Sequence, residues 1–212
     1  MALTQQQLNT RSNFIGSSEA SIIASGDLDA WQDLIDEKNG DKERKFDKNT
    51  KLRMAAGSHL ESFILDWFEN DFDIPLRTRD ILRHASPDYG LPIRSTLDAL
   101  TKYYDPVEAK AHFGFRDIDE LCEMYAPQCQ HHLVSTGREQ CFLVAFFAVH
   151  CRMEVRVINR DDNWINAYVD NCKKFWDWYQ SGVPPIDHVS LPPVVYDDMV
   201  TIDMSSLEFF DQ

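Results

Sequence analysis

Two carboxylates and a lysine lie close together near the middle of the chain, as Asp98 followed by Val107-Glu108-Ala109-Lys110. Alternate side chains of a β-strand point to the same face, so a strand here would put Glu108 and Lys110 side by side. Val107 and Ala109 would then point the other way, into a core. Asp98 precedes Glu108 by ten positions, which is enough for a hairpin to bring the two carboxylates together.

This group of side chains suits one kind of chemistry. Two carboxylates crowded at a strand edge are costly unless a divalent cation accepts them, and magnesium prefers a few carboxylates together with waters and phosphate. Lys110 would hold or help to deprotonate an attacking water and stabilise the developing charge. A metal-activated water that attacks a phosphodiester is the reaction that such a group supports. The bare pattern is weakly specific, because an acid-x-lysine triplet occurs by chance in many surface strands.

The elements on either side would position these residues. Apolar residues at helical spacing predict a helix over about 55–70, with the core stripe Leu60, Phe63, Ile64, Trp67 and Phe68. Glu61 lies about 100° around that helix from Leu60. It is either a solvated flank or a carboxylate directed at a site. Two or three strands over about 74–111 would carry Asp98, Glu108 and Lys110.

A polar helix face follows these strands. We expect one helix over 117–124 and a second that opens at Tyr125-Ala126-Pro127-Gln128, because proline is favoured in a first helical turn. Tyr125, Gln128 and His132 would share one side, which is unusually polar for a helix that faces a core. His131 and His132 lack metal-ligand spacing, and we interpret them as surface or helix-face residues.

The rest of the chain contains further expected elements. Segments 141–149 and 154–158 read as two buried strands joined by a turn, and about 161–181 as an amphipathic helix. Segment 15–23 reads as a turn leading into a helix, where free amides would bind an anion or be capped in the ordinary way. A helix is also expected over about 30–38.

A basic strip covers residues 42–53, with six basic residues against Glu43 and Asp47. The basic residues are Lys42, Arg44, Lys45, Lys48, Lys51 and Arg53. The strip is either a solvated loop or a local contact for nucleic acid.

Composition bounds the class of protein. With 212 residues, 43% of them hydrophobic, one domain over 1–188 is expected, followed by an acidic tail over 189–212 that has no lysine or arginine. The net charge of −14 argues against a generic polyanion binder, although a local basic strip is compatible with it. Five cysteines without a C-x-x-C pair disfavour zinc or iron–sulfur ligation and fit a reducing cytoplasm. The sequence shows no membrane-span or signal-peptide pattern.

Five blocks occur in an order that resembles the lambda-exonuclease-like, YqaJ-type branch of the PD-(D/E)XK nuclease superfamily. The blocks are Arg11 with Ile15-Gly16-Ser17-Ser18-Glu19, Gly57-Ser58-His59-Leu60-Glu61, Leu97-Asp98-Ala99, Val107-Glu108-Ala109-Lys110 and Tyr125-Ala126-Pro127-Gln128-Cys129-Gln130. The resemblance extends from Arg11 to about Pro185. It implies an α/β fold with a restriction-endonuclease-like core, in which helices flank a central mixed β-sheet.

The resemblance also implies roles for the matching residues at the reaction centre. Asp98, Glu108 and the carbonyl of Ala109 would bind catalytic Mg²⁺, for which Mn²⁺ would substitute. Lys110 would position the attacking water. Glu61 would assist at the metal site.

Further roles fall on residues outside this centre. Gln128 and Tyr125 would orient the water, the lysine or the scissile phosphate. Arg11 and Ser18 would bind the terminal 5′-phosphate of the DNA.

The sequence departs from the family pattern in two places. Ser-Thr-Leu-Asp98-Ala replaces the proline-aspartate-glycine form of many members, so the turn after Asp98 is expected to be less tight. The lysine that many relatives carry before the G-x-x-x-E helix has no unambiguous counterpart, because Leu52 falls there between Lys51 and Arg53. Which of these two cations contacts phosphate stays open.

The resemblance implies a 5′-to-3′ exonuclease that acts on the ends of linear double-stranded DNA in phage-type homologous recombination. It further implies a homotrimeric ring, a single-strand annealing partner and a place in the cytoplasm of a bacterial host. Two alternatives remain: an endonuclease or repair nuclease on the same fold, and a non-catalytic acidic DNA mimic. The tail over 197–212 would dock on a partner or a neighbouring subunit through its phenylalanines.

Overall fold

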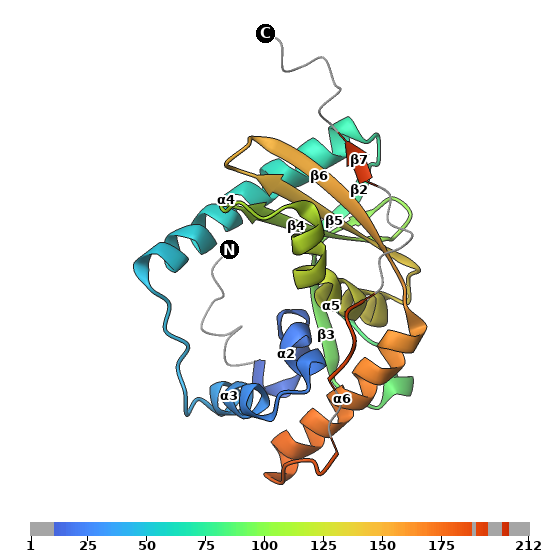
Figure 1. The fold of residues 1–212 in the computed structure, drawn as a ribbon. Helices are drawn as coiled ribbons and strands as arrows, with labels where there is room; N and C mark the ends of the chain where they lie inside the picture. Colours follow the sequence, from blue (N-terminus) through green and yellow to red (C-terminus); the bar gives the residue numbers. More distant parts are fainter. Residues whose placement is uncertain (1–10, 188–189, 195–200, 204–212) are drawn as a thin grey trace.

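A mixed β-sheet of seven strands forms the centre of the computed structural model, which describes residues 11–187, 190–194 and 201–203 (Figure 1). The strand order is β1-β3-β4-β5-β6-β7, and β2 pairs with β3. The β1–β3 and β4–β5 pairs are parallel, and the others are antiparallel. The strands are β1 (Ile15–Gly16), β2 (Leu76–His84), β3 (Ile93–Thr101), β4 (Pro106–His112), β5 (Gln140–Phe147), β6 (Arg152–Asn159) and β7 (Thr201–Asp203).

Helices cover both faces of this sheet. The helices are α2 (Ala20–Ser25), α3 (Leu28–Asn39), α4 (Lys48–Asp71), α5 (Ile118–Thr136) and α6 (Asp162–Ser181). Helix α4 packs on one face, where Ile64, Leu65 and Phe68 meet the strand residues Val107 and Val144. The opposite face of β5 packs with α2, α3, α5 and α6 in a second core (Figure 1). The expected mixed sheet flanked by helices is therefore confirmed.

Strands β1 and β4 lie end to end along one edge of β3. Gly16 pairs with Arg94 near the start of β3, whereas Val107 pairs with Ala99 near its end. Strand β2 pairs along the other edge over nearly the whole length of β3. The middle of β3, which includes Asp98, is therefore where the N-terminal segment and the E-x-K strand approach each other.

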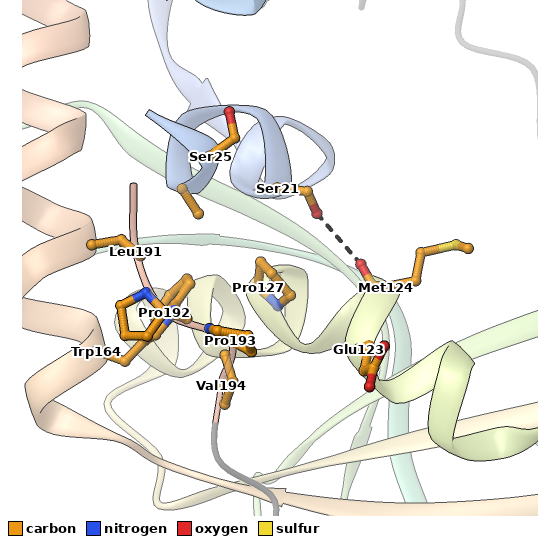
Figure 2. A pocket seen from close by; sticks show the side chains of 11 residues that line it. Ser21, Ser25, Glu123, Met124, Pro127, Trp164, Leu191, Pro192, Pro193 and Val194 are labelled. Atoms are coloured by element: carbon orange, nitrogen blue, oxygen red, sulfur yellow. Dashed lines mark hydrogen bonds between the residues drawn. The ribbon is translucent and has the colours of Figure 1, made fainter. Parts of the chain in front are cut away.

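Two expectations about helix boundaries were wrong. Residues 117–136 form one continuous helix from Ile118 to Thr136, with Pro127 inside it, rather than two helices. Proline removes one helical hydrogen bond, here the one to the carbonyl of Glu123. Glu123 and Pro127 both line an open pocket (Figure 2). Helix α4 begins at Lys48, capped by Asp47, so part of the basic strip is helical rather than a loop.

The described part of the C-terminal segment packs against the domain. The indole of Trp164 donates to the carbonyl of Pro192 at 3.1 Å, and the amide of Leu191 donates to Ala24 at 3.1 Å. This segment closes one side of a pocket of about 480 Å³ beside α2 and α5 (Figure 2). The phenylalanines of the tail lie outside the described residues. Within the described chain, the helices are too short or too polar to span a membrane.

Candidate active site

Glu108 is the centre of a buried polar cluster. Its side chain is on the face of β4 that packs toward α5, and the residue is 1% exposed. Its Oε1 accepts from Lys110 Nζ and from Gln128 Nε2, the latter at 2.7 Å. Its Oε2 lies 2.7 Å from His132 Nε2. Both carboxylate oxygens are therefore held by side chains from its own strand and from α5.

Asp98 lies beside this carboxylate. The β3–β4 register pairs Ala99 with Val107, and one further step puts Asp98 opposite Glu108. There the backbone pairing ends, and the amide of Ala109 donates to Oδ2 of Asp98 at 2.8 Å instead of to a strand carbonyl. Asp98 thus fills the place where the two strands separate.

Lys110 shares the face of Glu108, as the strand periodicity predicts. Its ammonium bonds to Glu108 and lies 4.9 Å from the ring centroid of Tyr125 on α5. Contact with the ring face favours the cation and limits the rotamers of the lysine. Tyr125 and Gln128 therefore reach the cluster from one side of α5, as expected.

His132 is the residue of this cluster that sequence reasoning misjudged. Both His131 and His132 are fully buried rather than exposed. His132 follows Gln128 by one helical turn and shares Glu108 with it, whereas His131 lies between the hydroxyl of Tyr168 and the carbonyl of Arg94. The signal was the i, i+4 spacing from Gln128 on a polar face, which metal-ligand spacing rules do not detect.

The two carboxylates have opposite protonation tendencies. Burial and the charge of Glu108 raise the pKa of Asp98 well above its ordinary value, although Lys110 opposes them. Burial acts on Glu108 in the same sense, but Lys110 and His132 outweigh it and lower the pKa of Glu108 to about 2. Asp98 is thus the carboxyl that holds a proton most readily, and Glu108 stays ionised.

Lys110 is a cation in this environment. Burial would lower its pKa, but the charges of Glu108 and Asp98 outweigh burial, so the pKa is raised above its ordinary value. Lys110 is therefore suited to orient water or to stabilise an anion. It is not suited to accept a proton while both carboxylates face it.

Two further carboxylates lie near the cluster. Burial raises the pKa of Glu61 on α4, and the charges of Asp80 and Glu108 raise it further. Glu61 is half-buried, and its charge interacts with those of Glu108 and Lys110. Asp80 was not expected. It has a φ of 53° within β2, at the register position opposite Asp98.

The donor set fits a hard divalent cation. Asp98, Glu108 and the carbonyl of Ala109 are all oxygen donors, and magnesium accepts a few such ligands and keeps several waters. The described residues contain no group of three or more His, Cys, Asp and Glu side chains arranged to hold a metal. Burial and the charge of Glu108 raise the pKa of Asp98, and a cation bound between the two carboxylates would lower it.

Arg11 and Ser18 form a separate cluster around the buried Glu19. Arg11 donates to Ser18 Oγ and to Glu19, each at 3.3 Å. Lys38 donates to Glu19 at 2.8 Å and to the carbonyls of Arg11 and Phe14. Helix α2 has only six residues, and the Gly16 amide before it already donates to Glu19. Of the two roles considered from the sequence, anion binding or ordinary capping, the Gly16 amide has the second, because Glu19 caps it.

The N-terminal cluster and the basic strip have different places in the fold. Ser21 Oγ donates to the carbonyl of Met124 at 3.4 Å, which holds the N-terminal segment next to the turn of α5 that carries Tyr125 (Figure 2).

Lys51 and Arg53 are exposed on the first turns of α4. They lie about 12–15 Å along that helix from Glu61. The structure thus leaves both as candidates for a phosphate contact.

The fold and the cluster define a class. The chain is an α/β protein with a mixed sheet and an Asp…Glu-x-Lys cluster where two strands separate. The family model described as YqaJ-like viral recombinase domain matches residues 6–139, well over half of the chain. The chain belongs to this family. No curated protein matches it.

Solved structures share the fold. An alkaline exonuclease (LHK-Exo) from Laribacter hongkongensis superposes with a TM-score of 0.67 at 16% identity, over 84% of this chain and 94% of that one. The same protein in complex with dAMP gives 0.65 at 15% identity and the same coverage. A phage related exonuclease from Haemophilus somnus 129PT gives 0.60 at 13% identity, over 80% of this chain and 96% of that one. At these identities the likeness shows the fold.

Proposed function

We propose that this protein is a magnesium-dependent nuclease that degrades linear double-stranded DNA from 5′ ends by phosphodiester hydrolysis. The observation that carries the proposal is the buried cluster of Asp98, Glu108 and Lys110, held by Gln128 and His132. Membership in the YqaJ-like family and the exonuclease neighbours support it.

The residues of the cluster would have separate roles in the hydrolysis. A bound divalent cation would polarise the phosphate and make a coordinated water more acidic. Asp98, Glu108 and the Ala109 carbonyl would hold that cation. Lys110, kept cationic by Glu108, would orient the attacking water and stabilise charge on the phosphate. Gln128 and His132 would fix the Glu108 oxygens.

Glu61 and the N-terminal cluster complete the proposed site. Glu61 would assist at the metal, and its charge interaction with Glu108 and Lys110 supports this role. Arg11 is partly exposed and Ser18 exposed, so both are accessible to a terminal 5′-phosphate. An arriving phosphate would share Arg11 with Glu19.

The test compares three DNA substrates with magnesium and with EDTA. We expect 5′-phosphorylated linear duplex to be shortened with magnesium, 5′-hydroxyl duplex to be shortened more slowly, and closed circular duplex to remain intact. Labels at the two ends of one strand report polarity. Cleavage of circles would favour the endonuclease alternative, and the absence of both metal binding and hydrolysis would favour the non-catalytic one.

The assembly and setting are also proposals. From the family we propose a homotrimeric ring, an annealing-protein partner and action in the cytoplasm of a bacterial host. Sedimentation of the purified protein tests the ring, since a purely monomeric species at working concentration would contradict it.

A further inference from the structure

One face of the β2–β3 hairpin is partly accessible and changes from acidic to basic along its length. Burial alternates in β3, so that Thr96 is exposed and Arg94 and Asp98 are partly buried, while Ser95 and Leu97 between them are buried. In the antiparallel register His84 lies opposite Arg94, and Asp80 takes the position opposite Asp98. Residues directly opposite in a β-pair share a face. Arg94 is thus about 13 Å along β3 from the proposed metal ligand Asp98.

Arg94 is held in place by an aromatic ring, but within the described part of the chain its side chain has no polar partner. Its guanidinium stacks 4.4 Å from the ring centroid of Phe14. Its Nε is buried, and no described residue hydrogen-bonds it. No described carboxylate forms an ion pair with this arginine. A buried donor without an acceptor is costly, and stacking on an aromatic ring limits its freedom to turn elsewhere.

The neighbouring cations Lys38 and Arg11, unlike Arg94, have a carboxylate partner. Lys38 lies on the same Phe14 ring, at 5.9 Å, but it bonds to Glu19 and to two carbonyls. Arg11 is also paired with Glu19. Glu19 therefore pairs with both Arg11 and Lys38, while Arg94 has no ion-pair partner among the described residues. Gly16 pairs with Arg94 in the sheet, which keeps this arginine beside the N-terminal cluster.

We propose that Arg94 binds a phosphate of the DNA strand that runs over the β2–β3 face from the carboxylate cluster toward the N-terminal cluster. The fork of the guanidinium matches phosphate geometry, and its ring contact pre-orients it. The bound phosphate is either an internal one or the terminal 5′-phosphate. The inference rests on the proposed function, because it assumes that DNA is the ligand.

The experiment measures binding without hydrolysis. A 3′-labelled duplex is titrated with protein in EDTA over a salt series, as 5′-phosphorylated and as 5′-hydroxyl DNA, and a gel confirms that the DNA stays intact. Arg94→Gln is compared with Arg83→Gln, which removes the same charge from an exposed arginine one residue from His84 on the other face of β2. Arg94→Lys retains the charge, and circular dichroism checks the fold of each variant.

We expect Arg94→Gln to weaken binding about tenfold, the effect of losing one charge-assisted hydrogen bond. The slope of log K against log salt should fall in magnitude by about 0.9, the value for one phosphate contact on duplex DNA. Arg83→Gln should change neither the affinity nor the salt dependence of binding, and Arg94→Lys should keep the wild-type salt dependence. An equal loss of affinity for the two duplexes would identify an internal phosphate as the ligand of Arg94. A loss of affinity for the 5′-phosphorylated duplex alone would identify the terminal phosphate.

Two results would overturn the inference, and they are distinguishable. If wild type binds duplex and Arg94→Gln behaves like Arg83→Gln, the subsite is refuted while the proposed function stands. If wild type binds no duplex at any salt concentration, the proposed function and the subsite both fail.

Discussion

Replacing Glu108 by glutamine should destabilise the metal-free protein substantially. The substitution keeps the shape of the side chain but removes the charge that Lys110 and His132 hold. It also puts an amide donor against donors from Lys110, Gln128 and His132. A buried ion pair that loses one partner leaves the other charge uncompensated.

The magnitude follows from the pKa of Glu108, which falls from 4.5 to about 2 in the folded protein. A shift of that size corresponds to about 3 kcal/mol in favour of the ionised form, since each pKa unit is worth about 1.4 kcal/mol. Removal of one partner from a buried pair typically costs about 3–5 kcal/mol. We therefore expect Glu108→Gln to lower the free energy of unfolding by about 3 kcal/mol at pH 7.

The pH dependence has a definite sign. A carboxyl whose folded-state pKa is lowered contributes stability above its unfolded pKa and loses it as the pH falls. The difference in the free energy of unfolding between wild type and Glu108→Gln should thus be constant above about pH 5. Below pH 4.5 this difference should shrink by about 1.4 kcal/mol per pH unit.

Urea denaturation in EDTA, followed by circular dichroism from pH 8 to pH 3.5, measures this difference in the free energy of unfolding. Glu43→Gln is the control, because Glu43 is exposed and the same change there should cost less than about 0.5 kcal/mol. The reasoning would be refuted if the free energy of unfolding of Glu108→Gln were within about 1 kcal/mol of the wild-type value at pH 7. It would also be refuted if the difference between the two proteins did not depend on pH.

Two further predictions concern buried charges. Metal binding should tighten as the pH rises and should release a proton, because burial and the charge of Glu108 raise the pKa of Asp98 and a cation must displace its proton. Calorimetry in two buffers with different ionisation heats measures the release, and identical heats in both would contradict it. Lys38→Met should lower the free energy of unfolding by about 3–5 kcal/mol, since it leaves the 1%-exposed Glu19 without this cation and two carbonyls without a donor. Lys174→Met on α6 is its control in urea denaturation, and equal midpoints for the two variants would contradict the role of Lys38.

The sequence predicted those parts of the site that follow from local periodicity. Strand alternation correctly put Glu108 with Lys110 and the neighbouring Ala109 in the core. Helical spacing correctly put Tyr125 and Gln128 on one side of α5. Both rules depend only on side-chain direction within one element, which the backbone fixes.

Features that depend on long-range packing were not predictable in this way. The burial of His132 depends on the docking of α5 over β4, and its bond to Glu108 spans 24 positions. The pairing of Gly16 with Arg94 brings the N-terminal segment to β3, although a two-residue strand has no period to detect. Continuity of α5 through Pro127 was missed because proline favours a first helical turn, whereas here it lies inside the helix.

The central claim is that the Asp98–Glu108–Lys110 cluster hydrolyses DNA, and one measurement tests it most directly. Wild type, Lys110→Met and Lys174→Met are incubated with 5′-phosphorylated linear duplex in magnesium, after circular dichroism has shown that all three are folded. We predict that wild type and Lys174→Met shorten the DNA at similar rates, and that Lys110→Met leaves it intact, as does wild type in EDTA. Shortening of the DNA by Lys110→Met at the wild-type rate would contradict the account.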